Sequence, residues 1–244
     1  MAGLAAAAIT YQDKTENLWI RIARAYPLFH FSLMEFIQYF AYPVLDQCGY
    51  GTNQFLSEVS TYHISLQALA IMPAIASYSS DPNAVKKAAL LGGVLSGLFL
   101  LCNFLPANRQ LPYDWLPPYF GPNFIGDQIA CIQSGIYHLA YVITSSYGMV
   151  IIYGSLFALM WSGFVWKNNW RMASYHCLMG FFFLYMPQWT LGVQTGEASA
   201  MYCFYSIPIA ISFLPRFKHI FSANKNSWDT DDDGDMQLQK VRID

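Results

Sequence analysis

The chain has 244 residues, of which 55% are hydrophobic and only 11% are charged, whereas a soluble domain carries about 25% charged residues. This composition excludes an ordinary soluble domain and predicts an integral membrane protein with the lipid bilayer as its partner. The aromatic fraction of 17% suits helices that end at membrane interfaces. A net charge of −2, without a clustered basic face, excludes nucleic acid as a partner.

Residues 1–26 are predicted to hold a partial or interfacial helix, because the first apolar stretch is too short to cross a bilayer. A transmembrane helical domain is expected at 27–215, followed by a polar, disordered cytoplasmic tail at 216–244. Runs long and apolar enough to span a membrane are found at 27–45, 57–78, 88–105, 147–166, 172–189 and 197–214. We therefore expect an all-α, polytopic bundle of about six full spans.

Residues 127–143 decide between six and seven spans, because this polar stretch either crosses the membrane or forms a re-entrant or capping segment outside it. Cytoplasmic loops collect Lys and Arg. With six spans, every Lys and Arg except Arg109 falls on one side, whereas a seventh span divides them between both sides. The charges favour six spans, with 127–143 as an outer cap and both flanks of the chain in the cytoplasm.

The first predicted span carries a polar stripe. Ser32, Glu35, Tyr39, Tyr42 and Asp46 follow one another at three or four residues, so they share one side of a helix. An ionisable group at membrane depth is a functional-site hypothesis by default, and Glu35 is the clearest case. The alternative is a protonated Glu35 that only hydrogen-bonds to a neighbouring helix.

The second predicted span presents Ser60, His63 and Gln67 on one face. His138 of the capping segment and Glu197, at the outer start of the last span, are expected at a similar level. Together these side chains predict an outward-facing polar pocket. The candidate ligand or proton pathway comprises Ser32, Glu35, Tyr39, Asp46, His63, Gln67 and Glu197.

Histidine supports two different chemistries at such a site. Neutral imidazole binds zinc, iron or copper, which makes His63 and His138 candidate metal ligands. Imidazole also titrates near neutral pH and so relays protons. The sequence contains no closely spaced His pair and identifies no cofactor. His30 and His219 are expected at the inner interface, where they need no functional role.

Two of the five Cys residues are candidates for a disulfide. Cys48 and Cys131 are both expected toward the outer side, and in an oxidising compartment they can pair and hold the capping segment over the bundle. Free, buried thiols are the alternative.

Several segments are similar to a known pattern: F-S-L-M-E at 31–35, D-Q-C at 46–48, TYHISLQ at 61–67, SGIYHLAY at 134–141 and NNWRMASYHCLMG at 168–180. With them the chain resembles an uncharacterised family of multi-pass membrane proteins, a domain of unknown function from bacteria, eukaryotes and large DNA viruses. The resemblance implies that the segment around His138 lies between spans. It also implies an extra N-terminal span, which this chain lacks or carries in truncated form. It implies no substrate and no reaction.

Three functions from different classes fit these observations. The leading hypothesis is a membrane protein whose polar pocket binds or transports a small ligand, ion or proton. The second is a membrane-embedded, metal-dependent enzyme. The third is a structural subunit of a membrane complex, in which the polar groups only join helices.

Overall fold

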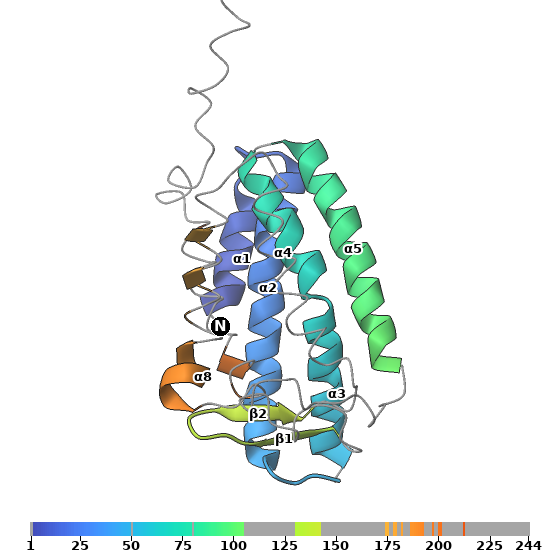
Figure 1. Ribbon diagram of the computed structural model, residues 1–244. Coiled ribbons are helices and arrows are strands. Elements are labelled where there is room, and N and C mark those ends of the chain that lie inside the picture. The colour runs from blue at the N-terminus through green and yellow to red at the C-terminus, as the bar shows by residue number, and fades with distance from the viewer. Residues whose placement is uncertain are drawn as a thin grey trace, which may run out of the picture.

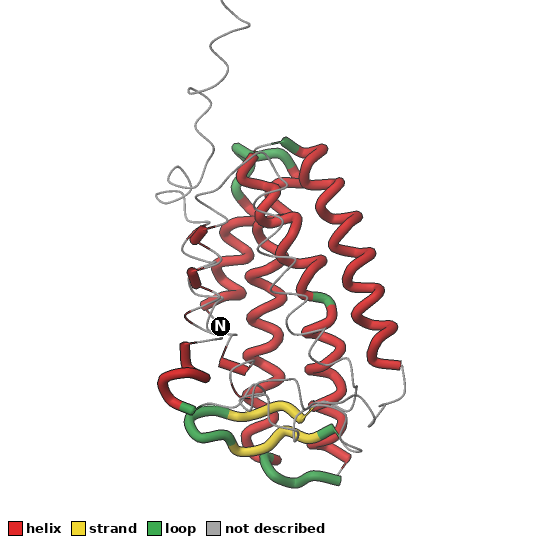
Figure 2. Tube along the Cα trace, in the orientation of Figure 1, coloured by secondary structure: helices red, strands yellow, loops and turns green. Residues whose placement is uncertain are grey.

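The computed structural model describes residues 2–49, 51–79, 81–104, 130–142 and 186–192, and single positions between 174 and 212. The described part is mostly helical, which confirms the predicted class in its coarse form (Figures 1 and 2). The helices are α1 (Ala2–Gln12), α2 (Leu18–Ala41), α3 (Gly51–Ser65), α4 (Gln67–Ala76), α5 (Pro82–Phe104) and α8 (Met186–Leu191). Two short 3-10 turns, η1 (Tyr42–Val44) and η2 (Ser77–Ser79), and two strands complete the set.

Helix α2 begins earlier than the predicted start at residue 27, so the predicted boundary between 26 and 27 falls inside one helix. Asn17 caps the helix, because its side-chain oxygen accepts a hydrogen bond from the Trp19 amide at 2.9 Å. Arg24 is buried, yet it pairs with Glu16 at 3.1 Å and donates to the Ser77 carbonyl at 2.8 Å. A paired arginine is compatible with a helix interior, which is why this charge does not mark the helix end.

Helices α3 and α4 form one long run with a break at Leu66, where the amide bonds to the His63 carbonyl three residues back. A new helix leaves its first amides without partners inside the helix. The Ser96 hydroxyl of α5 fills this need, since it accepts a hydrogen bond from the Leu69 amide at 3.0 Å. Ser96 of α5 therefore supplies an acceptor for the first turn of α4, where the helical run is broken.

Helix α5 approaches α4 closely at one glycine. A Cβ on Gly92 would stand 2.7 Å from the carbonyl oxygen of Ala68. Only glycine permits this backbone distance, and the neighbouring Gly93 meets no such obstacle. The other face of α5 carries exposed apolar side chains: Leu90, Leu91, Val94, Leu98 and Leu101.

Two helical runs in the described residues are long and apolar enough to cross a membrane, by length and composition. They are Gly51–Ser79 and Pro82–Leu101. They correspond to the predicted spans 57–78 and 88–105. The predicted span 27–45 falls on α2 and η1 and is not one of these two runs. The predicted spans at 147–166, 172–189 and 197–214 lie wholly or largely outside the described residues. The described residues therefore do not support six spans, and the six-span bundle stays a prediction.

The capping segment contains strands, which the all-α prediction did not include. Strands β1 (Cys131–Ser134) and β2 (Leu139–Val142) pair antiparallel, with Cys131 opposite Val142 and Ser134 opposite Leu139. This hairpin lies across the end of the bundle where α2 finishes and α3 begins (Figure 1). Residues 131–142 thus form a hairpin at the helix ends, whereas the seven-span alternative needs a helix there.

Candidate functional site

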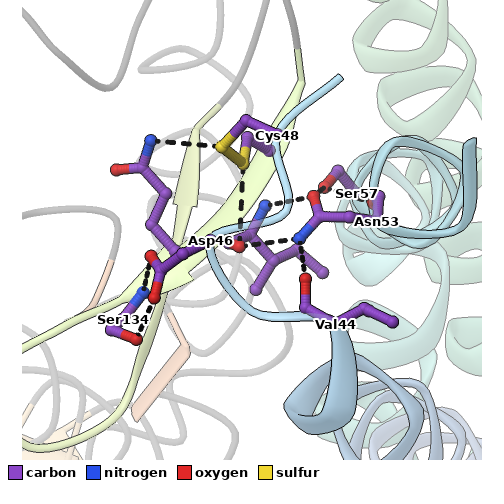
Figure 3. The surroundings of a disulfide bond; sticks show 9 residues. Val44, Asp46, Cys48, Asn53, Ser57 and Ser134 are labelled. Atoms are coloured by element: carbon purple, nitrogen blue, oxygen red, sulfur yellow. Dashed lines mark hydrogen bonds between the residues drawn. A yellow bond between two sulfur atoms is a disulfide. The ribbon is translucent and has the colours of Figure 1, made fainter. Parts of the chain in front are cut away.

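The hairpin is covalently tied to the bundle. A disulfide joins Cys48, in the loop after η1, to Cys131 at the start of β1, with the two Cα atoms 5.3 Å apart (Figure 3). This is the pairing considered from the sequence. It connects residues 83 positions apart and fixes the first strand against the end of α2.

The side-chain amide of Asn53, on α3, hydrogen-bonds to both the backbone N–H and the backbone carbonyl of Ile132 in β1. Its amide nitrogen donates to the carbonyl of Ile132 at 2.8 Å, and its oxygen accepts from the Ile132 amide at 2.9 Å. The nitrogen also donates to the Val44 carbonyl at 2.7 Å (Figure 3). Asn53 is fully buried, so these bonds satisfy backbone groups that water does not reach.

Asp46 holds the end of β1. Its backbone has a positive φ of 62°, a conformation that Asp tolerates better than most residues. Its carboxylate accepts from the amide of Ser134 at 2.8 Å and from the Ser134 hydroxyl (Figure 3). These two hydrogen bonds lower the pKa of Asp46. The structure therefore uses Asp46 as an anchor for the hairpin.

Glu197 binds the turn between the strands. Its carboxylate is buried and accepts hydrogen bonds from the amides of Ile136 at 2.9 Å, His138 at 2.7 Å and Tyr137. Consecutive backbone amides of this kind form a concave site for an anion. Gly135 is needed beside it, because a Cβ there would collide with the Glu197 carboxyl carbon and the His138 carbonyl.

His138 completes the hairpin contacts. Its Nδ1 atom and the Tyr42 hydroxyl share a hydrogen bond. Burial lowers the pKa of His138, and the nearby Glu197 carboxylate acts in the opposite direction. Three predicted site residues, Asp46, His138 and Glu197, are thus brought together with the disulfide at one end of the bundle.

A second polar region lies inside the bundle, between α2 and α3. The imidazole rings of His30 and His63 are stacked, with centroids 3.7 Å apart and planes inclined by 13°. The two side chains are 3% and 7% exposed. No described residue forms a hydrogen bond with the Nε2 atom of either ring. We call these two residues the histidine pair.

His63 of the histidine pair belongs to a buried polar stripe that follows α3 and ends at the start of α4. Asn53, Ser57, Ser60, His63 and Gln67 are spaced by three or four residues and are all buried. The hydroxyl of Ser57 donates to the Asn53 carbonyl and that of Ser60 to the Leu56 carbonyl, both at 2.8 Å. The face expected for Ser60, His63 and Gln67 therefore points inward and reaches the hairpin. We call these five residues the polar stripe.

The stripe expected on the first span is divided between two environments. Ser32 is buried and its hydroxyl donates to the Leu28 carbonyl at 2.7 Å. Glu35, Tyr39 and Tyr42 are exposed. These four side chains and Asp46 do not line one interior path in the described structure, because α2 turns His30 and Gln38 inward instead.

A family model described as a family of unknown function (DUF5765) matches residues 1–221. The chain belongs to this family. No curated protein matches the chain, and no solved structure matches it either. This match confirms the resemblance to a family of unknown function. It does not test the predicted membrane character of the DUF5765 chain.

The two predicted metal ligands of the DUF5765 chain lie at different levels of the bundle. His63 stacks on His30, whereas His138 bonds to Tyr42. Residues 30 and 42 are roughly 18 Å apart along the helical path at 1.5 Å per residue. In the described part of the chain, no three His, Cys, Asp or Glu side chains are grouped to hold a metal ion.

Three residues of the hairpin contacts and the histidine pair were not predicted from the sequence. His30 was assigned to the inner interface because the first span was started at residue 27, whereas α2 places it near the middle of the helix. Asn53 lies before the predicted second span, although its spacing from Ser57 and Ser60 would have joined it to the same face. Gly135 had no local signal, since its role depends on the distant Glu197.

Proposed function

We propose that the DUF5765 chain is a multi-pass membrane protein of about six spans that binds or transports a small ligand, ion or proton through an outward-facing polar pocket. The two apolar runs, Gly51–Ser79 and Pro82–Leu101, support the membrane part of this proposal. The exposed apolar face of α5 supports it as well, because lipid chains would cover such a surface.

The two ends of the bundle differ in a way that suits a membrane. Helices α2 and α5 both begin at the end opposite the hairpin (Figure 1). Their first two turns carry Arg21, Arg24, Lys86 and Lys87, and the Lys86 ammonium lies 5.4 Å from the centre of the Trp19 ring. Cytoplasmic ends collect Lys and Arg, and disulfides persist in oxidising compartments. This supports an orientation with the basic end in the cytoplasm and the hairpin outside.

The observation that carries the functional part is the histidine pair. Polar groups that only join helices are expected to be hydrogen-bonded, since a buried polar atom without a partner costs about 1–3 kcal/mol. The hydroxyls of the polar stripe meet this expectation, but the Nε2 atoms of His30 and His63 do not among the described residues. A buried polar atom in this state calls for an explanation, and an ion bound there or a catalytic role is one such explanation.

The test is protein-dependent flux into liposomes, measured for H⁺, Na⁺, K⁺ and Cl⁻ with the purified full chain. We expect at least one ion to move faster than in empty liposomes, and His63→Ala to remove most of the increase. Glu58→Gln, an exposed position on the same helix, is the matched control and keeps wild-type flux. Flux equal to empty liposomes for every ion, with no binding of any of them, overturns the proposal.

A further inference from the structure

The histidine pair is a site made by two helices, and its ionisation is constrained by its geometry. Two imidazolium ions stacked at 3.7 Å would repel strongly in a bundle interior, where the effective dielectric constant is low. The first proton on the pair therefore strongly disfavours a second one. A neutral imidazole carries one N–H and one bare nitrogen, so the pair is left with an acceptor for a single additional proton.

The described elements around the pair contain few groups that would fix this proton in place. Helix α4 has no ionisable side chain and α1 contributes only Tyr11. On α3, Glu58 and Tyr62 are exposed, and on α5 the same holds for Lys86 and Lys87.

On α2 itself, the Tyr26 ring lies 6.1 Å from that of His30. Arg24 is engaged with Glu16 and Ser77, and Glu35 is exposed. The charged side chains among these groups are exposed or, like Arg24, engaged with other residues. A proton on the pair is thus held by the imidazoles and not by a fixed counter-ion of the described elements.

The ring arrangement disfavours a metal ion held by both residues. Ligands to one ion direct their lone pairs to a common point. The imidazole lone pairs lie in the ring planes, and these planes are nearly parallel and stacked, so they do not converge between the rings. A proton makes no such demand, because each ring binds and releases it separately.

We infer that the histidine pair is a proton-carrying site, and that the ion moved in the proposed function is H⁺. One ring accepts a proton at its bare nitrogen, and the imidazolium then releases the proton from its other nitrogen to water, because the N–H bonds of stacked rings do not point at each other. The ring returns to the neutral state, so charge and protons balance in each passage. This inference rests on the proposed function and names its substrate.

The polar stripe gives the direction of the path. It extends from His63 toward Asn53, roughly 15 Å along α3, and so reaches the level of the hairpin. Each hydroxyl on the way donates to a carbonyl of its own helix, which leaves its oxygen as an acceptor. Beyond His63, Gln67 starts α4 directly after the helix break. Protons are expected to enter from the hairpin end along this face.

The experiment measures proton flux in liposomes that contain a pH-sensitive dye and a potassium gradient with valinomycin. We expect wild-type protein to pass protons, and His30→Ala and His63→Ala each to lower the rate at least tenfold. His219→Ala, a histidine outside the pair, retains wild-type rate. Because either variant can disturb folding, the intact Cys48–Cys131 disulfide and the helical circular dichroism signal are checked for every protein.

A second measurement reads the pair directly in the wild-type chain. With ¹⁵N-labelled histidine in lipid, we expect the two rings to titrate in two well-separated steps, as coupled sites do. Independent titration of both rings in one step overturns the inference.

The flux results separate the inference from the proposed function. Passage of Na⁺, K⁺ or Cl⁻ without H⁺ overturns the proton assignment and leaves the proposed function in place. Absence of flux and binding for every ion overturns both. Tight binding of Zn²⁺ alone that is lost in His30→Ala, with no proton flux, replaces the proton by a metal ion.

Discussion

The Glu197 carboxylate occupies the space beside Gly135 into which any larger residue would extend its Cβ. From there it accepts hydrogen bonds from three consecutive amides of the turn. Glu197 is in a helical segment about 60 residues after the hairpin. The turn is therefore held by a residue that is not part of the hairpin. The disulfide, Asp46 and Asn53 fix the first strand independently.

Glu197→Gln is expected to loosen the turn. The amide keeps one accepting oxygen, but its NH₂ group would face backbone donors, and hydrogen bonds to a charged group contribute about 1.5–3 kcal/mol. We expect faster amide hydrogen exchange in 135–138 and a smaller effect in β1, which the disulfide still holds. The exposed Glu58→Gln serves as control. Unchanged protection of the turn would contradict the role assigned to Glu197.

Gly92→Ala and Gly93→Ala form a matched pair with opposite expected signs. Alanine at 92 would meet the Ala68 carbonyl at 2.7 Å and force α4 and α5 apart, at a cost of about 1–3 kcal/mol. At 93 the nearest atom is 3.9 Å away, so the higher helix propensity of alanine stabilises by about 0.5–1 kcal/mol. Thermal unfolding in detergent measures both. Equal changes in melting temperature for the two variants would contradict the close approach of α4 and α5 at Gly92.

Acidification is expected to loosen the hairpin in two steps. Burial lowers the pKa of His138 from 6.5, so the folded state binds the proton less well than the unfolded state. The stabilisation from neutral His138 is complete above about pH 6.5 and is lost as the pH falls through the lower, folded-state pKa. Hydrogen bonds lower the pKa of Asp46 from 3.8 in the same sense, so its contribution is lost only below that pH.

Hydrogen exchange of 131–142 as a function of pH tests both steps. His138→Gln should remove the upper step and leave the lower one, and Asp46→Asn should do the reverse. A hairpin whose protection, corrected for intrinsic exchange, stays constant from pH 7 to 3 would be inconsistent with both assignments.

Loss of the disulfide is expected to destabilise the fold substantially. The crosslink spans 83 residues, and a loop of this length corresponds to roughly 4.5 kcal/mol of unfolded-state entropy. Dithiothreitol should therefore lower the melting temperature of the wild type. The Cys48→Ser, Cys131→Ser double variant is the control, since it should melt at the lower temperature and no longer respond to the reductant. The prediction is contradicted if mass spectrometry shows that the reductant has broken the disulfide and the melting temperature of the wild type is nevertheless unchanged.

The coarse fold was predictable because the apolar runs and the helical spacing of polar residues are local properties. The spacing of three and four residues alone predicts that Ser60, His63 and Gln67 share one face, and the structure shows that this face is buried. The hairpin was predicted only as a cap, because its strands are short and it is held by partners distant in sequence.

The histidine pair was not predictable from either helix by itself. His63 was singled out because it shares a face with two polar residues, but its partner depends on how α2 lies against α3. His30 was set aside because the first span was started at residue 27, which places His30 near the inner interface. Arg24 instead finds Glu16 and Ser77 as partners, and this tertiary contact lets α2 extend past it.

Site-specific labelling tests the proposed membrane arrangement most directly. Single cysteines are introduced at Ile136, exposed in the hairpin turn, and at Lys87, exposed near the start of α5, with Cys48 and Cys131 kept and the other cysteines changed to serine. Intact vesicles are then treated with a membrane-impermeant maleimide. We predict that only one of the two positions reacts before the vesicles are opened, and that the other reacts afterwards. Reaction of both positions from the same side, or release of the chain from the vesicles by alkaline carbonate, would contradict a bundle that crosses the membrane between them.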